Sequence, residues 1–260
     1  MKPLEAKDRI IVALDVSDLT SAFKLVNQLS SHVGFFKVGF EFIYSTMATL
    51  LSLSDSDSKD HLYRLRDFMQ LLEGKILLDV KLNDIPNTIG KAAKAIARIN
   101  PAMFTMHASA GSEAIGIAAT NKGSSKLFGV TVLTSFAGLQ CKAVFGDTIT
   151  STIVRFAYML LNYGADGIIC APKEAPLLRS HLEFKNMIIA CPNVRPAWAT
   201  STDDQNKDRQ MTPGEAVKAG IDMLIIGRPI TSPPPEIGTP LDAAKLIAQE
   251  IHEALQLKEV

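Results

Sequence analysis

Three charged side chains stand at the end of one apolar run, in the segment GKILLDVKLNDIPNT at positions 74–88. They are Asp79, Lys81 and Asp84, and they follow three aliphatic residues at 76–78. Charged groups are costly to bury unless they are paired or used in a reaction. Asp79 and Lys81 are one residue apart, so in a strand both side chains project from the same face. The segment therefore predicts a site where an ammonium group and a carboxylate can stabilise developing charge or move a proton.

Polar residues also close other apolar runs of the chain. Six of the eight runs end in this way, at Asp15, Lys37, Asp79 with Lys81, His107, Thr134, and Gly227 with Arg228. Taken singly, Asp15 could cap a following helix, and Lys37 could extend its ammonium group into solvent. His107 is interpreted as a hydrogen-bonded structural histidine and is left outside the catalytic set. Taken together, these residues indicate a site built where the runs end.

The apolar runs are short, and helical patterns separate them. They lie at positions 9–15, 34–39, 75–81, 102–108, 127–133, 166–171, 186–193 and 222–229. Near-continuous hydrophobicity is typical of strands that are buried on both faces, and parallel strands need crossover helices. The pattern predicts an α/β fold, a (β/α)₈ TIM barrel, in which the chemistry is built at the carboxyl ends of the strands.

Two of the predicted helices have well-marked ends. Pro86 begins a helix whose apolar residues at 89, 93, 96 and 97 share one face. Thr212 is a predicted N-cap, with Pro213 at the first helical position, Glu215 three residues after the cap and Gly220 as the stop.

No linker or low-complexity tract divides the chain, so residues 1–260 are predicted to form a single domain. The polar run from Ser52 to Asp60 is interpreted as a surface insertion between two helical pieces, without a catalytic role.

Composition excludes several classes of protein. The 260 residues are 47% hydrophobic and have a formal net charge of zero, which argues against a nucleic-acid partner. The three cysteines form no CxxC pair, so a disulfide framework is not expected and a reducing compartment is favoured. No apolar stretch reaches the length of a membrane span, and the charged amino terminus differs from a signal peptide. A cytoplasmic protein is expected.

The segment LLDVKLNDIPNT resembles the D-x-K-x-x-D-I-P-x-T signature of the orotidine 5′-phosphate decarboxylases, and the order and spacing of the motifs resemble the bacterial branch of that family. Six further segments carry the likeness along the chain: IVALDVSD, FFKVGFE, MHASAG, GVTVLTS, GADGIICAPKEA and DMLIIGRPIT. The short VRP segment at 194–196 also matches. The resemblance implies conversion of orotidine 5′-phosphate to UMP and CO₂ without cofactor or metal.

The resemblance also implies roles for the charged residues. Lys81 stabilises and then protonates a vinyl carbanion at C6, and Asp79 lies near the substrate carboxylate and repels it in the ground state. Lys37 pairs with Asp79 and orients Lys81, so that charges alternate through Lys37, Asp79, Lys81 and Asp84. In the family, the carboxylate at the Asp84 position comes from the partner subunit, which implies a homodimer with a shared active site.

Substrate-binding positions follow from the same likeness. Asp15 and Lys37 are expected at the ribose, Thr134 at the pyrimidine edge, and Gly227 and Arg228 at the phosphate. The remaining positions implied to bind substrate are Thr88, Arg195 and Gln205. The chain departs from the family pattern in having Asn193 where glycine is usual and a longer segment at 197–210. Asparagine tolerates a positive φ angle better than most residues.

Two other functions compete with this interpretation. A magnesium-dependent sugar-phosphate decarboxylase or aldolase of the same barrel group shares D-x-K-x-x-D, but it carries a metal-binding glutamate on the second strand. Here that position is Lys37, a cation that repels magnesium. A non-catalytic barrel that binds a nucleotide monophosphate through Gly227 and Arg228 would have no need of Lys81.

Overall fold

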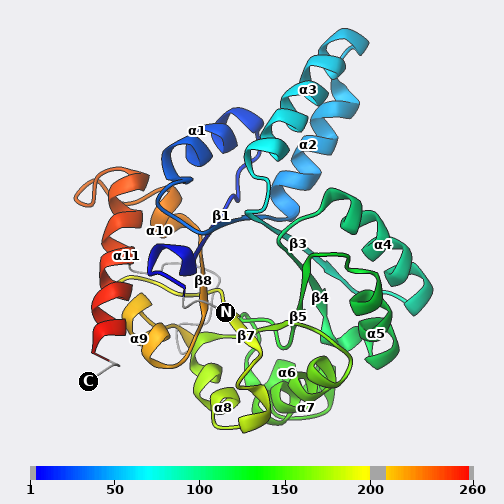
Figure 1. Cartoon of the computed structure of the whole chain (residues 1–260), viewed down its shortest axis with the longest axis vertical. Coiled ribbons are helices and arrows are strands. Elements are labelled where there is room, and N and C mark those ends of the chain that lie inside the picture. The colour runs from blue at the N-terminus through cyan, green and yellow to red at the C-terminus, as the bar shows by residue number, and fades with distance from the viewer. Residues whose placement is uncertain (1–3, 200–208, 258–260) are drawn as a thin grey trace.

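The chain folds into a closed barrel of parallel strands, which confirms the predicted (β/α)₈ TIM barrel (Figure 1). The computed structural model describes residues 4–199 and 209–257. Within these residues the strands follow chain order around the barrel, and β1 closes on β8. The strands are β1 (Ile10–Ala13), β2 (Phe35–Val38), β3 (Ile76–Leu82), β4 (Met103–His107), β5 (Lys126–Val130), β6 (Gly167–Ile169), β7 (Ile188–Cys191) and β8 (Met223–Ile226).

Helices surround the barrel and connect one strand to the next (Figure 1). The α-helices are α1 (Leu19–Leu29), α2 (Phe40–Ser52), α3 (Asp55–Leu71), α4 (Pro86–Ile99), α5 (Ser112–Asn121), α6 (Gly138–Phe145), α7 (Ile149–Asn162), α8 (Ala175–Arg179), α9 (Pro213–Lys218), α10 (Arg228–Thr231) and α11 (Pro240–Gln256). The 3₁₀ turns are η1 (Lys7–Arg9), η2 (Ala108–Ala110), η3 (Pro172–Glu174) and η4 (Leu182–Phe184). The predicted Thr212 cap is confirmed, since its side chain accepts a hydrogen bond from the Glu215 amide.

Residues alternate between two apolar layers along each strand. On β1, Ile11 and Ala13 belong to the cluster inside the barrel, whereas Ile10 and Val12 belong to the larger cluster under the helices. This alternation follows from the two-residue period of a strand. Both layers are buried, which explains why the strands read as continuous hydrophobic runs.

Gly167 makes room for an aromatic ring inside the barrel. It pairs with Phe128 on the neighbouring strand, and Phe128 belongs to the interior cluster. A Cβ atom at Gly167 would lie 2.4 Å from the Phe128 ring and 2.8 Å from the backbone oxygen of Ile188. The backbone contact cannot be relieved by rotating a side chain, so the position requires glycine.

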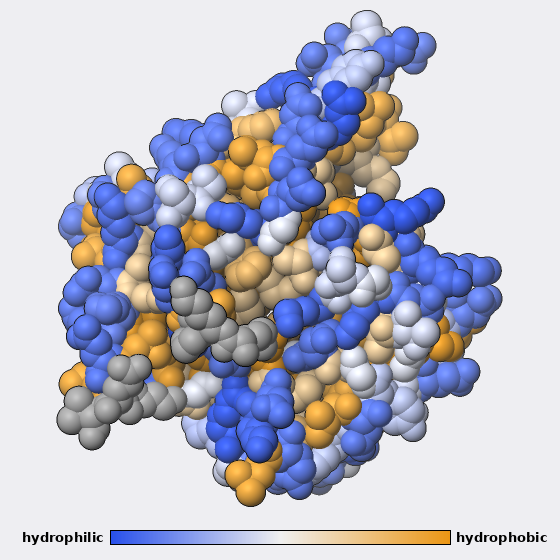
Figure 2. Space-filling model, in the orientation of Figure 1, coloured by the Kyte–Doolittle hydropathy of each residue, from blue (hydrophilic) through white to orange (hydrophobic). Residues whose placement is uncertain are grey.

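The polar residues at 52–60 lie where helices α2 and α3 meet. Only Leu53 and Ser54 interrupt the helices, and Asp55 begins α3, because the Ser54 side chain accepts a hydrogen bond from the Asp57 amide and caps the helix. Helices α2 and α3 form a hairpin that projects from the barrel (Figure 1). Apolar side chains gather along one edge of this hairpin (Figure 2). Large side chains of α2 that are exposed include Tyr44, Met47 and Leu51.

No single helix in the described part of the chain is long and apolar enough to cross a membrane, although α6 and α7, bent by 51°, pass that test as a pair.

Replacing Gly167 by alanine should destabilise the barrel, because the added methyl group overpacks the interior against Phe128 and the Ile188 backbone. Overpacking of this kind typically costs about 1–3 kcal/mol, so the midpoint of urea unfolding, followed by circular dichroism, should fall. Gly138→Ala is the matched control, since a Cβ atom there has no neighbour within 4 Å and lies at the start of α6. An equal fall in both variants would contradict the packing argument.

Candidate active site

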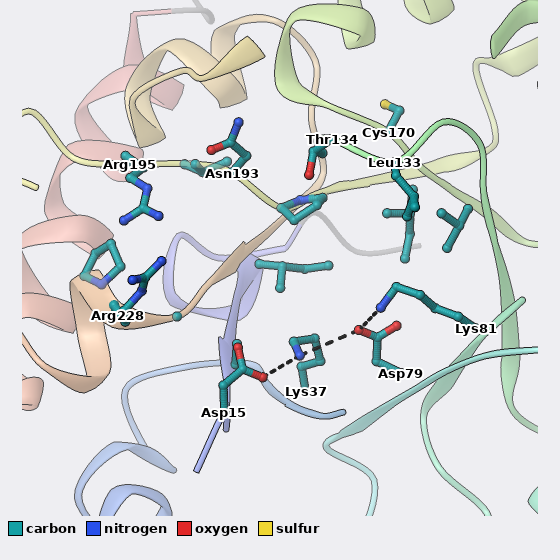
Figure 3. A pocket seen from close by; sticks show the side chains of 18 of the residues that line it. Asp15, Lys37, Asp79, Lys81, Leu133, Thr134, Cys170, Asn193, Arg195 and Arg228 are labelled. Atoms are coloured by element: carbon teal, nitrogen blue, oxygen red, sulfur yellow. Dashed lines mark hydrogen bonds and ion pairs between the residues drawn. The ribbon is translucent and has the colours of Figure 1, made fainter. Parts of the chain in front are cut away.

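Four charged side chains form a continuous network at the carboxyl ends of β1, β2 and β3 (Figure 3). The Lys81 ammonium donates a hydrogen bond to Asp79 Oδ2 at 2.7 Å. Lys37 Nζ lies 3.6 Å from the same oxygen and donates a shorter bond, of 2.8 Å, to Asp15 Oδ1. The expected pairs of Asp79 with Lys37 and with Lys81 are therefore present, and Asp15 adds a second carboxylate to the network.

Strand alternation explains why these side chains meet. Leu77 and Phe35 pack in or against the interior cluster, and Asp79 and Lys37 each follow two residues later on the same face. Since β2 and β3 are neighbours in the barrel, the two side chains lie next to each other at its mouth. Gly39 leaves space beside them, because a Cβ atom there would lie 2.7 Å from the Lys37 ammonium.

Asp79 is the buried centre of the network, with 7% of its surface exposed. Burial acts to raise the pKa of Asp79, but the Lys81 and Lys37 ammonium groups outweigh it, and the pKa lies below its usual value of 3.8. Asp79 is therefore a carboxylate at neutral pH. The Lys81 ammonium also lies 5.4 Å from the centre of the exposed Phe40 ring, a distance at which a cation–π contact is favourable.

The network opens into a cavity of about 580 Å³, within the range of small-molecule sites. Apolar residues from the strand ends form part of its wall, among them Val130, Ile169 and Ile225. Thr134, four residues beyond the end of β5, also lines the cavity, at the position where the sequence predicts a contact with a pyrimidine edge. The cavity therefore offers an apolar surface with a few polar groups at its borders.

Two arginines lie on the side of the cavity away from Lys81 (Figure 3). Arg228 begins α10 directly after Gly227, and Arg195 follows Asn193 beyond β7. Asn193 adopts a φ angle of 64°, which confirms that asparagine supplies the left-handed conformation at this turn. Two guanidinium groups at one end of a cavity can bind a phosphate dianion with several charge-assisted hydrogen bonds.

Two of the predicted site residues lie outside this cavity. Asp84 and Thr88 are exposed around the start of α4. The Asp84 carboxylate accepts a hydrogen bond of 2.7 Å from the amide of the next residue, Ile85. Among the described residues Asp84 forms no ion pair, so the predicted alternation of charges ends at Lys81 within this chain. Gln205 lies outside the described residues.

A buried ion pair that the sequence analysis missed supports the cavity wall. Arg209, 7% exposed, pairs with Glu174 and donates hydrogen bonds to the backbone oxygens of Leu133, at 2.8 Å, and Phe136, at 3.1 Å. Burial raises the pKa of Glu174, and the Arg209 charge opposes this shift. Thr134 lies between Leu133 and Phe136 in the sequence, so the hydrogen bonds from Arg209 hold the segment that contains Thr134 in place. The charged run around Arg209 offers no pattern that would have singled it out.

No group of three or more His, Cys, Asp or Glu side chains in the described part of the chain is placed to hold a metal ion. The cationic Lys37, between Asp15 and Asp79, occupies the space where two carboxylates could otherwise share a divalent ion.

Comparison with known proteins gives a consistent result along the chain. The model of the "Orotidine 5'-phosphate decarboxylase / HUMPS family" matches residues 8–237. An orotidine 5′-phosphate decarboxylase of Moorella thermoacetica is 34% identical over 261 residues, which cover 95% of this chain and 94% of that protein. One from a Nostoc species is 36% identical over 257 residues, with 95% and 98% covered. The crystal structure of the Lactobacillus acidophilus orotidine 5′-phosphate decarboxylase superposes with a TM-score of 0.71 and 28% identity, covering 93% and 98%.

His107 should report the charge of Lys81. Burial lowers the pKa of His107 below 6.5, and the Lys81 charge lowers it further, against an opposing effect of Asp79. The folded protein thus favours the neutral ring, and this contribution to stability is present above pH 6.5 and is lost as the pH falls. The ring signals of His107 in NMR spectra, assigned with a His107→Gln variant, should titrate with a midpoint below 6.5.

The Lys81→Met variant should raise this midpoint, because it removes the nearby positive charge. Lys24→Met, which removes an exposed charge on α1, is the control and should leave the midpoint unchanged. A His107 midpoint that does not respond to Lys81→Met would show that the two groups are not electrostatically coupled.

Proposed function

The chain belongs to the orotidine 5′-phosphate decarboxylase / HUMPS family, and we propose that it converts orotidine 5′-phosphate to UMP and CO₂, with its own side chains as the catalytic groups. It is a carboxy-lyase by this assignment. One observation carries the proposal: a lysine ammonium held 2.7 Å from a buried carboxylate, across a nucleotide-sized cavity from two arginines.

The two ends of the cavity match the two ends of the substrate. The phosphate binds at Arg228 and Arg195, next to Gly227, where the backbone is unshielded by a side chain. Asp15 and Lys37, which already form a hydrogen bond with each other, bind the ribose hydroxyl groups. The pyrimidine then lies over the apolar wall near Thr134, with its C6 carboxylate toward Lys81 and Asp79. Thr88 and Gln205 remain predicted contacts.

Lys81 performs the chemical step. The bond between C6 and the carboxylate breaks, CO₂ leaves, and the electron pair stays on C6 as a vinyl carbanion. The Lys81 ammonium stabilises this charge as it develops and then donates a proton to C6, which gives UMP and a neutral amine that takes a proton from solvent. Preorganised contacts of this kind are each worth about 10²–10³ in rate.

Asp79 acts on the ground state. Its low pKa supports an ionised carboxylate next to the substrate carboxylate, where the two negative charges repel each other until neutral CO₂ departs. Such repulsion accelerates the reaction only because phosphate and ribose contacts hold the substrate in place. Lys37 limits the repulsion by sharing the Asp79 charge, and it keeps Asp79 ionised when no substrate is bound.

Asp84 completes the site of a second copy of the chain. Its exposed carboxylate has no cationic partner among the described residues of its own chain, and it lies at the turn before α4, close in sequence to the exposed Ile85. We therefore retain the predicted homodimer, in which Asp84 of one protomer approaches the Lys81 ammonium of the other. A cytoplasmic location also remains a prediction.

Lys81→Ala should abolish turnover while binding of UMP stays within about tenfold, because remote contacts carry ground-state affinity and Lys81 acts mainly on the carbanion. The loss of substrate absorbance measures turnover, and calorimetry measures UMP binding. Lys24→Ala, an exposed lysine on α1, is the control and should match the parent protein.

Loss of one ordinary oxyanion contact lowers the rate by at least about a hundredfold. If Lys81→Ala keeps more than about a hundredth of the parent activity, Lys81 is not the central catalytic group. The assay is repeated with a chelator, since activity that disappears and returns with magnesium would favour the metal-dependent enzymes of the same barrel group.

Mixing two inactive variants, Asp84→Ala and Lys81→Ala, should restore activity if the site is shared between subunits. A random heterodimer then contains one site with both defects and one with neither. At equal mixing about half of the dimers are heterodimers, so about a quarter of the sites should become active by two-fold symmetry. Exchange is verified by mass spectrometry of differently tagged subunits. Absence of recovery after complete exchange would place Asp84 in the site of its own chain.

A further inference from the structure

Strand β3 is irregular where it carries the two catalytic charges. Leu78 pairs with Phe104 on β4, but the next paired residues are Leu82 and Met106. Strand β3 therefore advances four residues while β4 advances two, and the extra residues form a bulge that contains Asp79 and Lys81. Bulges redirect side chains, and this one lies at the mouth of the barrel, where Lys81 must point into the cavity.

The bulge holds Lys81 in an unusual backbone conformation. Its φ angle is 42°, in the left-handed region that lysine rarely occupies. Such a conformation persists only where surrounding contacts hold it in place. The position of the Lys81 ammonium thus depends on whatever holds its backbone, in addition to the ion pair with Asp79.

Thr105 supplies that contact. It lies on β4, two residues after the interior residue Met103 on the same face, and its exposed fraction is 0%. Its hydroxyl accepts a hydrogen bond from the Lys81 amide at 2.9 Å and donates one to Asp79 Oδ1 at 2.9 Å. One hydroxyl therefore joins the strained backbone of the lysine to the carboxylate that pairs with its side chain.

The two oxygens of the Asp79 carboxylate therefore have different hydrogen-bond and ion-pair partners. Oδ1 accepts the Thr105 hydroxyl, while Oδ2 faces the Lys81 and Lys37 ammonium groups. Because both oxygens have partners, the plane of the carboxylate is held in place, and Oδ2 stays directed at the two ammonium groups. Thr105 is not among the described residues that line the cavity, so we place it behind Asp79 and out of contact with the bound substrate.

We propose that Thr105 is a positioning residue for the decarboxylation, which holds the β3 bulge so that the Lys81 ammonium and the Asp79 carboxylate meet the substrate in reactive geometry. This inference rests on the proposed function of Lys81. Misplacement of a reacting group by about 1 Å can reduce the rate about a hundredfold. Loss of the hydroxyl should therefore act on turnover, with little effect on substrate binding.

Three substitutions test the proposal. Thr105→Val keeps the shape of the side chain and removes the hydroxyl, Thr105→Ser keeps the hydroxyl, and Thr152→Val removes a fully buried hydroxyl on α7 as the matched control. Thr105→Val should lower kcat by about 10- to 100-fold with KM within about twofold. Thr105→Ser should restore kcat to within about threefold of the parent, and Thr152→Val should leave both constants unchanged.

A second measurement does not depend on activity. The His107 ring responds to both Lys81 and Asp79. In Thr105→Val its NMR titration midpoint should rise toward 6.5 as Lys81 moves from its held position, while Thr152→Val leaves it in place. If the parent protein proves inactive, the proposed function fails and this titration alone decides the role of Thr105.

The proposal is wrong if the Thr105→Val variant has the same kcat and the same His107 titration midpoint as the parent protein. It is also wrong if the serine variant is as impaired as the valine variant, or if KM changes as much as kcat. If Thr105→Val does not fold, Thr105→Cys takes its place, since a thiol is a weaker hydrogen-bond partner in a side chain of similar size. Unchanged turnover in the folded cysteine variant would then reject the proposal.

Discussion

The Asp79 carboxylate is the group on which the site depends. It is almost fully buried, and a buried carboxylate is stable only when opposite charges and hydrogen bonds surround it. Three neighbouring strands meet this requirement, because Lys37 comes from β2, Lys81 from β3 and the Thr105 hydroxyl from β4. Satisfying one buried charge thereby brings together Lys81, its ion pair with Asp79 and the hydroxyl that binds the Lys81 backbone.

The closed barrel builds this assembly on neighbouring strands of one sheet. Strand order brings β1 against both β2 and β8, so Asp15 lies close to Lys37 on one side and to Gly227 on the other. The lysine end and the arginine end of the cavity are thus built on one continuous hydrogen-bonded sheet. Dipoles and charges held in this way need little rearrangement during a reaction, which is how electrostatic stabilisation becomes effective.

Several elements could be predicted because they depend on local pattern. The buried strands are continuous apolar runs in the sequence, and Thr212 and Pro213 mark the start of α9. Asp79 and Lys81 meet as their spacing predicts, but a bulge in β3, with Lys81 at a φ angle of 42°, brings them together in place of regular alternation. A polar run of Ser and Asp, as at 52–60, is compatible with either a loop or a capped helix, and the Ser54 cap decides for the helix.

The sequence by itself determined the fold class, the carboxyl-end location of the charges and the residues that form the central ion pair, because strand periodicity and motif spacing are properties of adjacent positions. Only the tertiary structure decided which distant groups complete the site. Thr105 lies 24 residues from Lys81, and Arg209 lies 35 from Glu174, yet each pair is in contact. Nothing local distinguishes this threonine or this arginine from its neighbours; their roles arise because closure of the sheet buries donors and acceptors together that lie far apart in the sequence.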